Sequence, residues 1–176
     1  MKLTKVETFR IRPRWLLLRL ETDDGLIGWG EPVVEGRAAT TQACIHELEP
    51  YLLGADPRNV EDIWQTIYRG GFYRGGPVLT SALSGIDQAL WDIKGKALGV
   101  PVHELLGGRV REKMEVYSWI DSDTPEICAK SALEKKAQGF RNIKMLGTGR
   151  IGWINDSRAI TGLLEKVQAV RDAAGP

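Results

Sequence analysis

The residue types that most often carry catalysis are sparse in this sequence. The only histidines, His46 and His103, each stand alone in a segment with helical spacing, so we predict that both are structural or surface residues. Cys44 and Cys128 lie far apart without metal-ligand spacing around them, and we expect free thiols. The residues alone therefore predict no Cys/His or Ser/His/Asp catalytic arrangement.

The glycine-rich segment 68–76, YRGGFYRGG, is a second candidate for a functional site. Its glycines and arginines suggest a phosphate-binding loop, but the lysine and the Ser or Thr of a P-loop are missing. The segment also links two predicted helices, whereas a P-loop follows a strand. Two interpretations stay open, a tight flexible connection or a loop that faces a substrate.

Composition limits the classes of function. Apolar residues make up 43% of the 176 residues and charged residues 27%, which is enough to fill a core. With 24 basic and 23 acidic residues the formal net charge is +1. The overall charge therefore does not attract nucleic acid or an anionic membrane. No apolar run approaches the ~18 residues of a spanning helix, and MKLTKVETFRI does not resemble a secretion signal. We expect a cytoplasmic protein.

The elements that must position any site begin with a small sheet. Alternating apolar residues predict three antiparallel strands, at residues 2–11, 15–22 and 26–30. The sequence Asp23-Asp24-Gly25 suits a hairpin turn between the last two. Helical spacing follows at residues 38–53, with Pro50 expected to disturb the last turn. Asp56 and Pro57 then predict the cap and first residue of a second helix.

The stretch 80–108, TSALSGIDQALWDIKGKALGVPVHELLGG, predicts the central helix. Spacings of three and four place these apolar residues on one face: Leu83, Ile86, Leu90, Ile93 and Ala97. We expect a helix from Ser81 to Leu98, capped by Thr80 or Ser81 and preceded by extended chain at Pro77. Gly99 supplies a left-handed exit, and Pro101 opens a short helix through Leu106.

Polar residues on this helix form two groups. Asp92 and Lys96 are spaced i, i+4, and we predict a solvated pair on the outside of the helix. Asp87 and Trp91 border the buried face, so their contact is expected to hold the helix against a neighbour. The sheet and helices together predict an α+β domain over residues 1–112.

The pattern changes near Glu112. A strand at 114–120, a helix at 124–138, a strand at 140–146 and a helix from Asp156 follow in the order of a parallel βα structure. Two parallel strands leave an unpaired edge on each side, and parallel sheets are stable mainly when they are wide and covered. We therefore expect a further strand after Pro176, or another element that completes the sheet.

Specific motifs also identify a family resemblance. The run from Ala82 to Gly108, with the flanking GFYRGG and the earlier GWGEPVVEGRA, resembles the enolase superfamily in its mandelate racemase and muconate lactonizing branch. The resemblance implies an α+β capping domain, with a three-stranded antiparallel sheet plus a helical bundle, over 1–112. It implies that 113–176 are the first βαβα units of an incomplete (β/α) TIM-type barrel.

The resemblance implies a Mg²⁺-dependent acid-sugar dehydratase, for which D-galactonate is the expected substrate. A base removes the proton beside the carboxylate, and loss of the 3-hydroxyl gives a 2-keto-3-deoxy acid. The Mg²⁺ ligands and the histidine acid and base are expected beyond Pro176, so the 176-residue chain alone is predicted to be inactive. A homo-oligomer is expected at full length. Dehydration of another aldonic acid, and a non-catalytic capping fragment acting in assembly, remain alternatives.

Among the residues present, Lys144 is the catalytic candidate, because it lies near the carboxyl end of the second barrel strand. A surface lysine is the alternative. Some relatives carry Lys-x-Lys here, whereas Leu146 cannot abstract a proton, and acid-sugar dehydratases of this kind are expected to carry asparagine there. The matching substrate-binding positions in the capping loops offer directed donors to carboxylate and hydroxyls: Arg14, Trp15, Glu35, Arg37, Tyr73 and Arg74.

Overall fold

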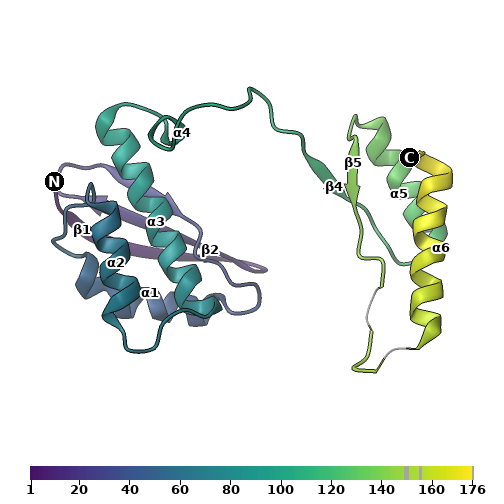
Figure 1. The fold of residues 1–176 in the computed structure, drawn as a ribbon, viewed down its shortest axis with the longest axis horizontal. Helices are drawn as coiled ribbons and strands as arrows, with labels where there is room; N and C mark the ends of the chain where they lie inside the picture. Colours follow the sequence, from purple (N-terminus) through teal and green to yellow (C-terminus); the bar gives the residue numbers. More distant parts are fainter. Residues whose placement is uncertain (149–150, 155, 176) are drawn as a thin grey trace. The chain divides into compact units, whose positions relative to one another are not determined.

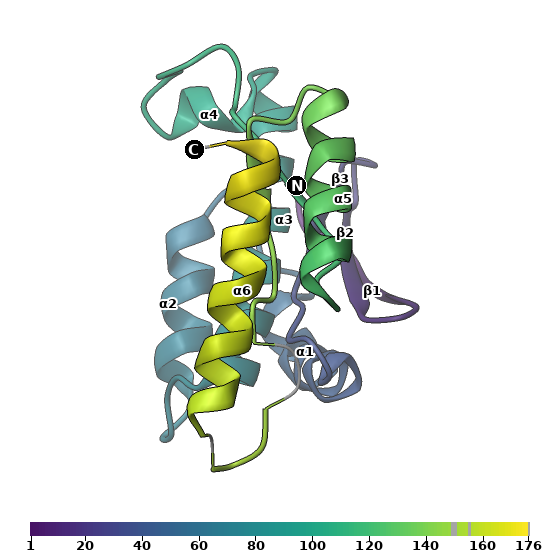
Figure 2. The same cartoon turned by 90° about the vertical axis from the view of Figure 1, so that its right-hand side faces the viewer.

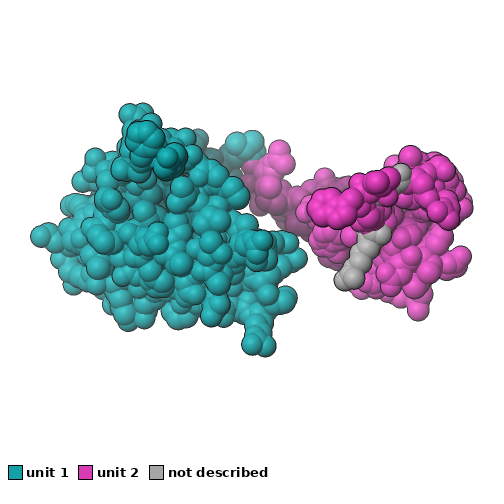
Figure 3. Space-filling view, turned by 90° about the horizontal axis from the view of Figure 1, so that it is seen from below, with its two compact units in different colours: residues 1–110 teal, residues 111–176 magenta. Residues whose placement is uncertain are grey.

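The computed structural model describes residues 1–148, 151–154 and 156–175. They form two compact units, Met1–Val110 and Arg111–Pro176 (Figure 3). Of the helices described, none has the length and apolar character that crossing a bilayer requires.

The first unit contains the predicted three-stranded antiparallel sheet. Its strands are β1 (Leu3–Ile11), β2 (Trp15–Thr22) and β3 (Ile27–Gly30), in the order β1-β2-β3. Side chains alternate across the sheet, because successive residues of a strand point to opposite faces. Along β2 the buried positions are Leu16, Leu18, Leu20 and Thr22. The sheet therefore has one core face and one outer face.

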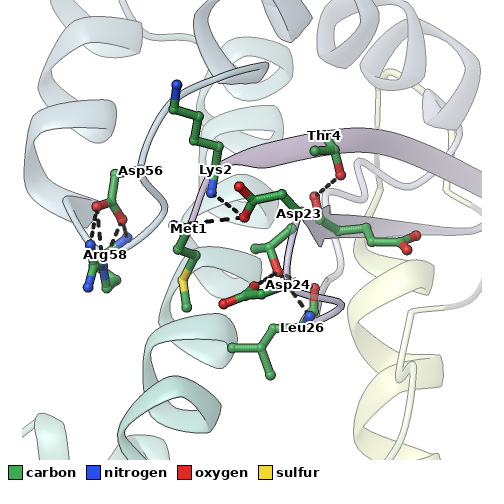
Figure 4. A network of polar contacts seen from close by, with 10 residues as sticks. Met1, Lys2, Thr4, Asp23, Asp24, Leu26, Asp56 and Arg58 are labelled. Carbon is green, nitrogen blue, oxygen red and sulfur yellow. Dashed lines mark hydrogen bonds and ion pairs between the residues drawn. The ribbon is translucent and has the colours of Figure 1, made fainter.

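A polar network closes the turn between β2 and β3 (Figure 4). The backbone N–H of Gly25 donates to the Thr22 carbonyl at 3.1 Å, and Gly25 has φ +84°, a conformation that glycine adopts without strain. The Asp23 carboxylate accepts the backbone N–H of Lys2 at 2.8 Å, which ties the start of the chain to the turn. The predicted hairpin is confirmed.

Four helices belong to the same unit: α1 (Ala38–Leu52), α2 (Val60–Gly70), α3 (Pro77–Leu98) and the short α4 (Val102–Leu105). The helices α1, α2 and α3 lie over one face of the sheet (Figure 1). The predicted apolar face of α3 is buried at Leu83, Ile86, Leu90 and Ile93, whereas Ala97 is exposed. Ile86, Leu90 and Ile93 of this face form the core of the unit together with Leu16, Leu18 and Leu20.

The predicted start of α3 is wrong. The helix begins at Pro77, four residues earlier than expected, and Thr80 and Ser81 lie inside it. Proline suits a first helical position because its fixed φ is already helical and its missing N–H has no partner there. The predicted exit is confirmed, since Gly99 is left-handed with φ +69° and its N–H donates to the Lys96 carbonyl at 3.2 Å. Pro101 precedes α4 as its N-cap residue.

The start of α2 also differs from the prediction. The helix begins at Val60 after Asn59, because Asp56 is used elsewhere. Its carboxylate accepts the backbone N–H of Arg58 at 3.0 Å and pairs with the Arg58 guanidinium at 2.6 Å (Figure 4). These bonds lower the pKa of Asp56 to about 2. Pro50 lies inside α1, which continues to Leu52.

The strand β3 and the helix α3 approach each other closely. A Cβ atom on Gly28 would collide with the Ala89 carbonyl oxygen, and one on Gly30 with the Gly85 carbonyl oxygen. Gly85 in turn leaves room for Pro32, which follows β3. Strand and helix therefore meet backbone to backbone, which only glycine permits.

Asp92 and Lys96 form the predicted i, i+4 ion pair, which is partly exposed, and both side chains also bond to the backbone of β3. The Asp92 carboxylate accepts the backbone N–H of Trp29 at 3.0 Å, and the Lys96 ammonium donates to the Ile27 carbonyl at 2.7 Å and to Asp92 at 2.7 Å. One turn earlier, the Gln88 side chain accepts the N–H of Glu31 at 2.8 Å. Side chains of α3 thus supply hydrogen bonds to β3 along its open edge.

Asp87 is a partly buried carboxylate on α3. Burial raises the pKa of Asp87, the hydrogen bond of the Trp91 side chain lowers it in part, and Glu61 on α2 raises it further. Trp91 itself lies under the Lys94 ammonium, 5.3 Å from the ring centroid. The Asp87–Trp91 contact expected from the spacing is present.

The second unit runs through β4 (Tyr117–Trp119), α5 (Pro125–Ala137), β5 (Asn142–Lys144) and α6 (Ser157–Ala174). The strands pair in parallel, with Ser118 opposite Ile143, and both are shorter than the predicted runs. The Thr124 hydroxyl caps α5 by accepting the N–H of Ile127 at 3.3 Å, and Asp156 caps α6 through the N–H of Arg158 at 2.9 Å. The predicted strand, helix, strand, helix order is confirmed.

We expect Gly28→Ala and Gly30→Ala each to destabilise the first unit by ~3 kcal/mol, since the added methyl group must push α3 away from β3. Urea unfolding followed by circular dichroism measures the change. Gly70→Ala at the end of α2 is the matched control, because a Cβ there meets no atom within 4 Å. Equal stability of Gly28→Ala and Gly70→Ala would contradict the backbone contact.

Asp87→Asn tests the raised pKa of the buried carboxyl. An acid whose pKa is raised on folding keeps its proton in the folded state after the unfolded chain has lost it, near the ordinary value of 3.8. The free energy of unfolding of the natural sequence should therefore fall as the pH rises above 3.8, relative to Asp87→Asn. Unfolding free energies measured from pH 3 to 7 check this, with Asp62→Asn on α2 as control. A pH-independent difference would contradict it.

Candidate functional site

The first group of candidate residues lies where the β1–β2 turn meets the loop after β3. The Arg14 guanidinium is 3.4 Å from the Glu35 carboxylate, and it also lies over the Trp15 ring, 5.6 Å from the centroid. All three side chains are exposed, so the pair is weakly held and free to exchange partners. The structure brings these three predicted residues together.

Arg37 closes the same loop through its backbone. Its N–H donates to the Val34 carbonyl at 2.8 Å, and its own carbonyl accepts the Thr41 N–H at 3.0 Å at the start of α1. The Thr41 hydroxyl donates to the same carbonyl at 3.2 Å. These bonds fix the loop that carries Glu35, whereas the Arg37 side chain is exposed.

Tyr73 and Arg74 lie in the loop between α2 and α3. Phe72 and Tyr73 are 90% and 85% exposed and meet edge to face, with ring centroids 5.2 Å apart. The hollow beside Tyr73 and Arg74 measures about 30 Å³, the volume of about one water molecule. This loop therefore presents side chains to a ligand without enclosing one, and within the described chain no contact joins it to Arg14.

Lys144 ends β5 beside two aromatic rings of β4. Its ammonium is 4.6 Å from the Trp119 ring centroid and 5.4 Å from that of Tyr117. Trp119 stands opposite Lys144 in the strand register, and Tyr117 lies two residues earlier, so both rings point to the same face. Cation–π contacts hold the ammonium over these rings. Tyr-x-Trp at strand spacing was the signal in the sequence that could have predicted this contact.

One hydrogen-bonded chain was missed at the sequence level, where His46 was expected to stand alone. The His46 ring contacts the Thr8 hydroxyl through Nε2 at 3.3 Å and the Glu49 carboxylate through Nδ1 at 2.5 Å. Gln42 donates to the same hydroxyl at 2.8 Å. The order of groups is that of a nucleophile, base and acid. Gln42 and His46 lie on α1 and Thr8 lies on β1, so these hydrogen bonds link this helix to the edge strand of the sheet.

The described residues do not fit a magnesium site. In residues 1–148, 151–154 and 156–175, no group of three or more His, Cys, Asp or Glu side chains could hold a metal ion. Mg²⁺ prefers several oxygen ligands in near-octahedral geometry.

Cys44 and Cys128 are free and buried, and burial raises the pKa of both thiols.

The fold and motifs agree with one family. Residues 5–107 match the model described as "Mandelate racemase / muconate lactonizing enzyme, N-terminal domain". This match spans more than half of the chain, and the chain belongs to the mandelate racemase and muconate lactonizing enzyme family of the enolase superfamily. The three-stranded antiparallel sheet with its helices is the capping domain of that superfamily, as the resemblance implied.

Two curated relatives of the chain share one name. The chain is 54% identical to D-galactonate dehydratase of Ralstonia nicotianae and 53% identical to that of Pectobacterium atrosepticum, over 175 residues in each case. These matches cover 99% of this chain and 46% of each relative. The chain therefore spans about half the length of the curated relatives it matches.

Solved structures agree in fold. An enolase from Pantoea ananatis with bound D-gluconate and Mg is 31% identical, with a TM-score of 0.86 over 99% of this chain and 51% of that one. A mandelate racemase/muconate lactonizing enzyme from Jannaschia sp. CCS1 is 29% identical, with a TM-score of 0.88 over 99% and 52%. The chain again spans about half of each neighbour.

The cation–π contact of Lys144 makes a spectroscopic prediction. Protons above an aromatic ring are shielded, so the Lys144 ε-methylene protons should resonate upfield of those of the other lysines. Trp119→Leu should move this signal to the position of the other lysines, as seen in a ¹H–¹³C spectrum. Trp153→Leu is the control, because Trp153 is fully exposed. An unshifted signal in the natural sequence would contradict the contact.

Proposed function

We propose that this chain supplies the capping domain and the first βα units of a Mg²⁺-dependent acid-sugar dehydratase that acts on D-galactonate. The identity of 54% with a D-galactonate dehydratase across 99% of the chain carries the proposal. The reaction removes the proton beside the carboxylate and expels the 3-hydroxyl, which leaves a 2-keto-3-deoxy acid and water.

In this proposal the capping loops recognise the substrate. Arg14 is the strongest candidate, because its exposed guanidinium can exchange Glu35 for the substrate carboxylate and offer two parallel hydrogen bonds. Trp15 directly follows Arg14, and Arg37 lies on the loop that carries Glu35. Tyr73 and Arg74 add hydroxyl and guanidinium donors from an exposed loop, which suits a polyhydroxylated acid.

We infer that residues 113–176 are the start of a (β/α) barrel, with the domain boundary near Glu112. The parallel pairing of β4 and β5 and the helix after each strand support this assignment. Lys144 then lies at the carboxyl end of a barrel strand, where such enzymes build their sites. The Tyr117 and Trp119 rings restrict its ammonium to one face of the strands, which favours a site role over that of an unrestrained surface lysine.

Mg²⁺ would stabilise the negative charge that proton removal creates on the substrate carboxylate. The described residues form no magnesium site. We therefore assign the ion and its carboxylate ligands to the part of the relatives' length that this chain does not span. A cytoplasmic location and a homo-oligomer complete the proposal. The free thiols favour a reducing compartment.

Dehydration of a different aldonic acid is the second candidate. The observation that favours it is Leu146, which is 56% exposed two residues after Lys144, where an asparagine is expected for galactonate. Leucine removes a hydrogen-bonding group from this strand end. Substrate preference among aldonic acids therefore separates the two candidates.

A chimera tests the proposed function. This chain is joined to the part of the Ralstonia nicotianae relative that it does not span, and the product is assayed as a 2-keto-3-deoxy acid with Mg²⁺ and D-galactonate. We expect turnover by the chimera and none by the 176-residue chain alone. Turnover of D-gluconate but not D-galactonate would select the second candidate, and a folded chimera that is inactive on all aldonic acids would overturn both.

Within this chimera, Arg14→Ala should raise KM at least tenfold, because a charge-assisted hydrogen bond contributes about 1.5–3 kcal/mol. Arg58→Ala is the matched control, since the Arg58 guanidinium pairs with Asp56 at 2.6 Å, away from the capping loops. Steady-state kinetics measure both. An unchanged KM in Arg14→Ala would remove Arg14 from the substrate site.

A further inference from the structure

A hydroxyl, an imidazole and a carboxylate follow one another where α1 lies beside β1 (Figure 2). The Thr8 hydroxyl oxygen is 3.3 Å from His46 Nε2, and His46 Nδ1 is 2.5 Å from the Glu49 carboxylate. His46 and Glu49 are spaced i, i+3 on α1, so a single turn of this helix presents both groups to the strand. None of the three residues belongs to the loops proposed to recognise the substrate.

The partners of each group fix the direction of these hydrogen bonds. A carboxylate only accepts, so Glu49 places the proton of the neutral His46 ring on Nδ1 and leaves Nε2 as an acceptor. The Gln42 side-chain amide donates to the Thr8 oxygen at 2.8 Å, so the Thr8 proton is directed to Nε2. A hydroxyl oxygen has two lone pairs, and one stays free for attack. This polarity is that of a nucleophile beside a general base.

Reagents can reach these groups from solvent. The side chains of His46 and Glu49 are 48% and 31% exposed, and Thr8 is half-buried. Thr4 on the same strand offers an internal comparison, because its hydroxyl donates to the Glu21 carbonyl at 3.2 Å. In the described part of the chain no imidazole bonds to Thr4. The two threonines therefore differ in access to a base.

Arg10 indicates which reagent the site would take. Arg10 follows Thr8 by two residues, so both side chains extend from the same face of β1. It is exposed, and the ion pairs formed among the described residues do not include it. A guanidinium binds phosphate through two parallel hydrogen bonds. A donor whose leaving group is phosphate therefore fits this face.

We propose that Thr8 is an acylation site that takes an acyl group from an acyl phosphate. The Thr8 oxygen attacks the carbonyl carbon while His46 Nε2 takes the hydroxyl proton. The bond between the carbonyl carbon and the phosphate oxygen breaks, and the proton passes from the imidazolium to the departing phosphate beside Arg10. An ester on Thr8, free phosphate and a neutral His46 remain. The proposal is independent of the proposed dehydration.

Peptide mapping by mass spectrometry tests the site after the 176-residue chain is incubated with acetyl phosphate. General-base catalysis contributes about 10²–10⁴-fold, so an acetyl ester should form on Thr8 at least tenfold faster than on Thr4. Hydroxylamine should remove this ester, which distinguishes it from the amide of an acetylated lysine. Equal esters on both threonines, no ester on Thr8, or phosphate on His46 in its place overturns the proposal.

Variants separate the base from the anion-binding group. His46→Gln should slow acetylation of Thr8 at least tenfold. His103→Gln is the matched control, because the His103 ring lies beside Glu104 and bonds to no hydroxyl in the described structure. Arg10→Gln should slow the reaction with acetyl phosphate but not with p-nitrophenyl acetate, whose leaving group carries no phosphate. Thermal unfolding checks that each variant folds, and an unchanged rate in a folded His46→Gln overturns the proposal.

The tautomer of His46 provides a readout that needs no acyl donor. Long-range ¹H–¹⁵N spectra of the neutral ring should show the proton on Nδ1, which bonds to Glu49. Thr8→Val removes the hydroxyl and should leave this tautomer unchanged. A proton on Nε2 in the natural sequence would leave no base facing Thr8 and would overturn the proposal.

Discussion

The backbone contact between β3 and α3 is the constraint on which the first unit depends. Gly28 and Gly30 let the strand reach the carbonyl oxygens of the helix, and a side chain at either position would separate them. Among the strands that the structure describes, the short β3 pairs only with β2, so its other edge needs partners. Asp92 and Lys96 supply them, so the free edge of β3 is hydrogen-bonded by side chains of α3 instead of by a further strand.

This arrangement explains how loops far apart in the sequence are held. The sheet fixes the β1–β2 turn, and the β3–α3 contact fixes the chain that leaves β3 at Pro32. Arg14 on the turn and Glu35 on the following loop therefore meet, although 21 residues separate them. The same helix α3 begins at the loop that carries Tyr73, so both exposed loops depend on one rigid element. Catalytic enzymes commonly place variable loops on such rigid supports.

The sequence predicted features that depend on periodicity and missed those that depend on distant partners. The strands, the buried face of α3 and the Gly99 exit follow from local spacing. The Asp92–Trp29 bond spans 63 residues and the Thr8–His46 contact 38, so no local pattern indicates either. The start of α2 was misplaced because Asp56 bonds to Arg58 instead of capping the helix, and both geometries use the same residue types.

The two units differ in how many of their side chains are buried, and this difference bears on the barrel proposal. The continuous core of buried residues lies in the first unit, whereas α6 buries none of its residues and the aromatic rings of β4 stay exposed. A two-stranded parallel sheet exposes both edges, and such sheets are stable when more strands and helices cover them. Lys144 over Trp119 partly shields one face. In the proposed barrel, further βα units would cover this exposed apolar surface of β4 and α6.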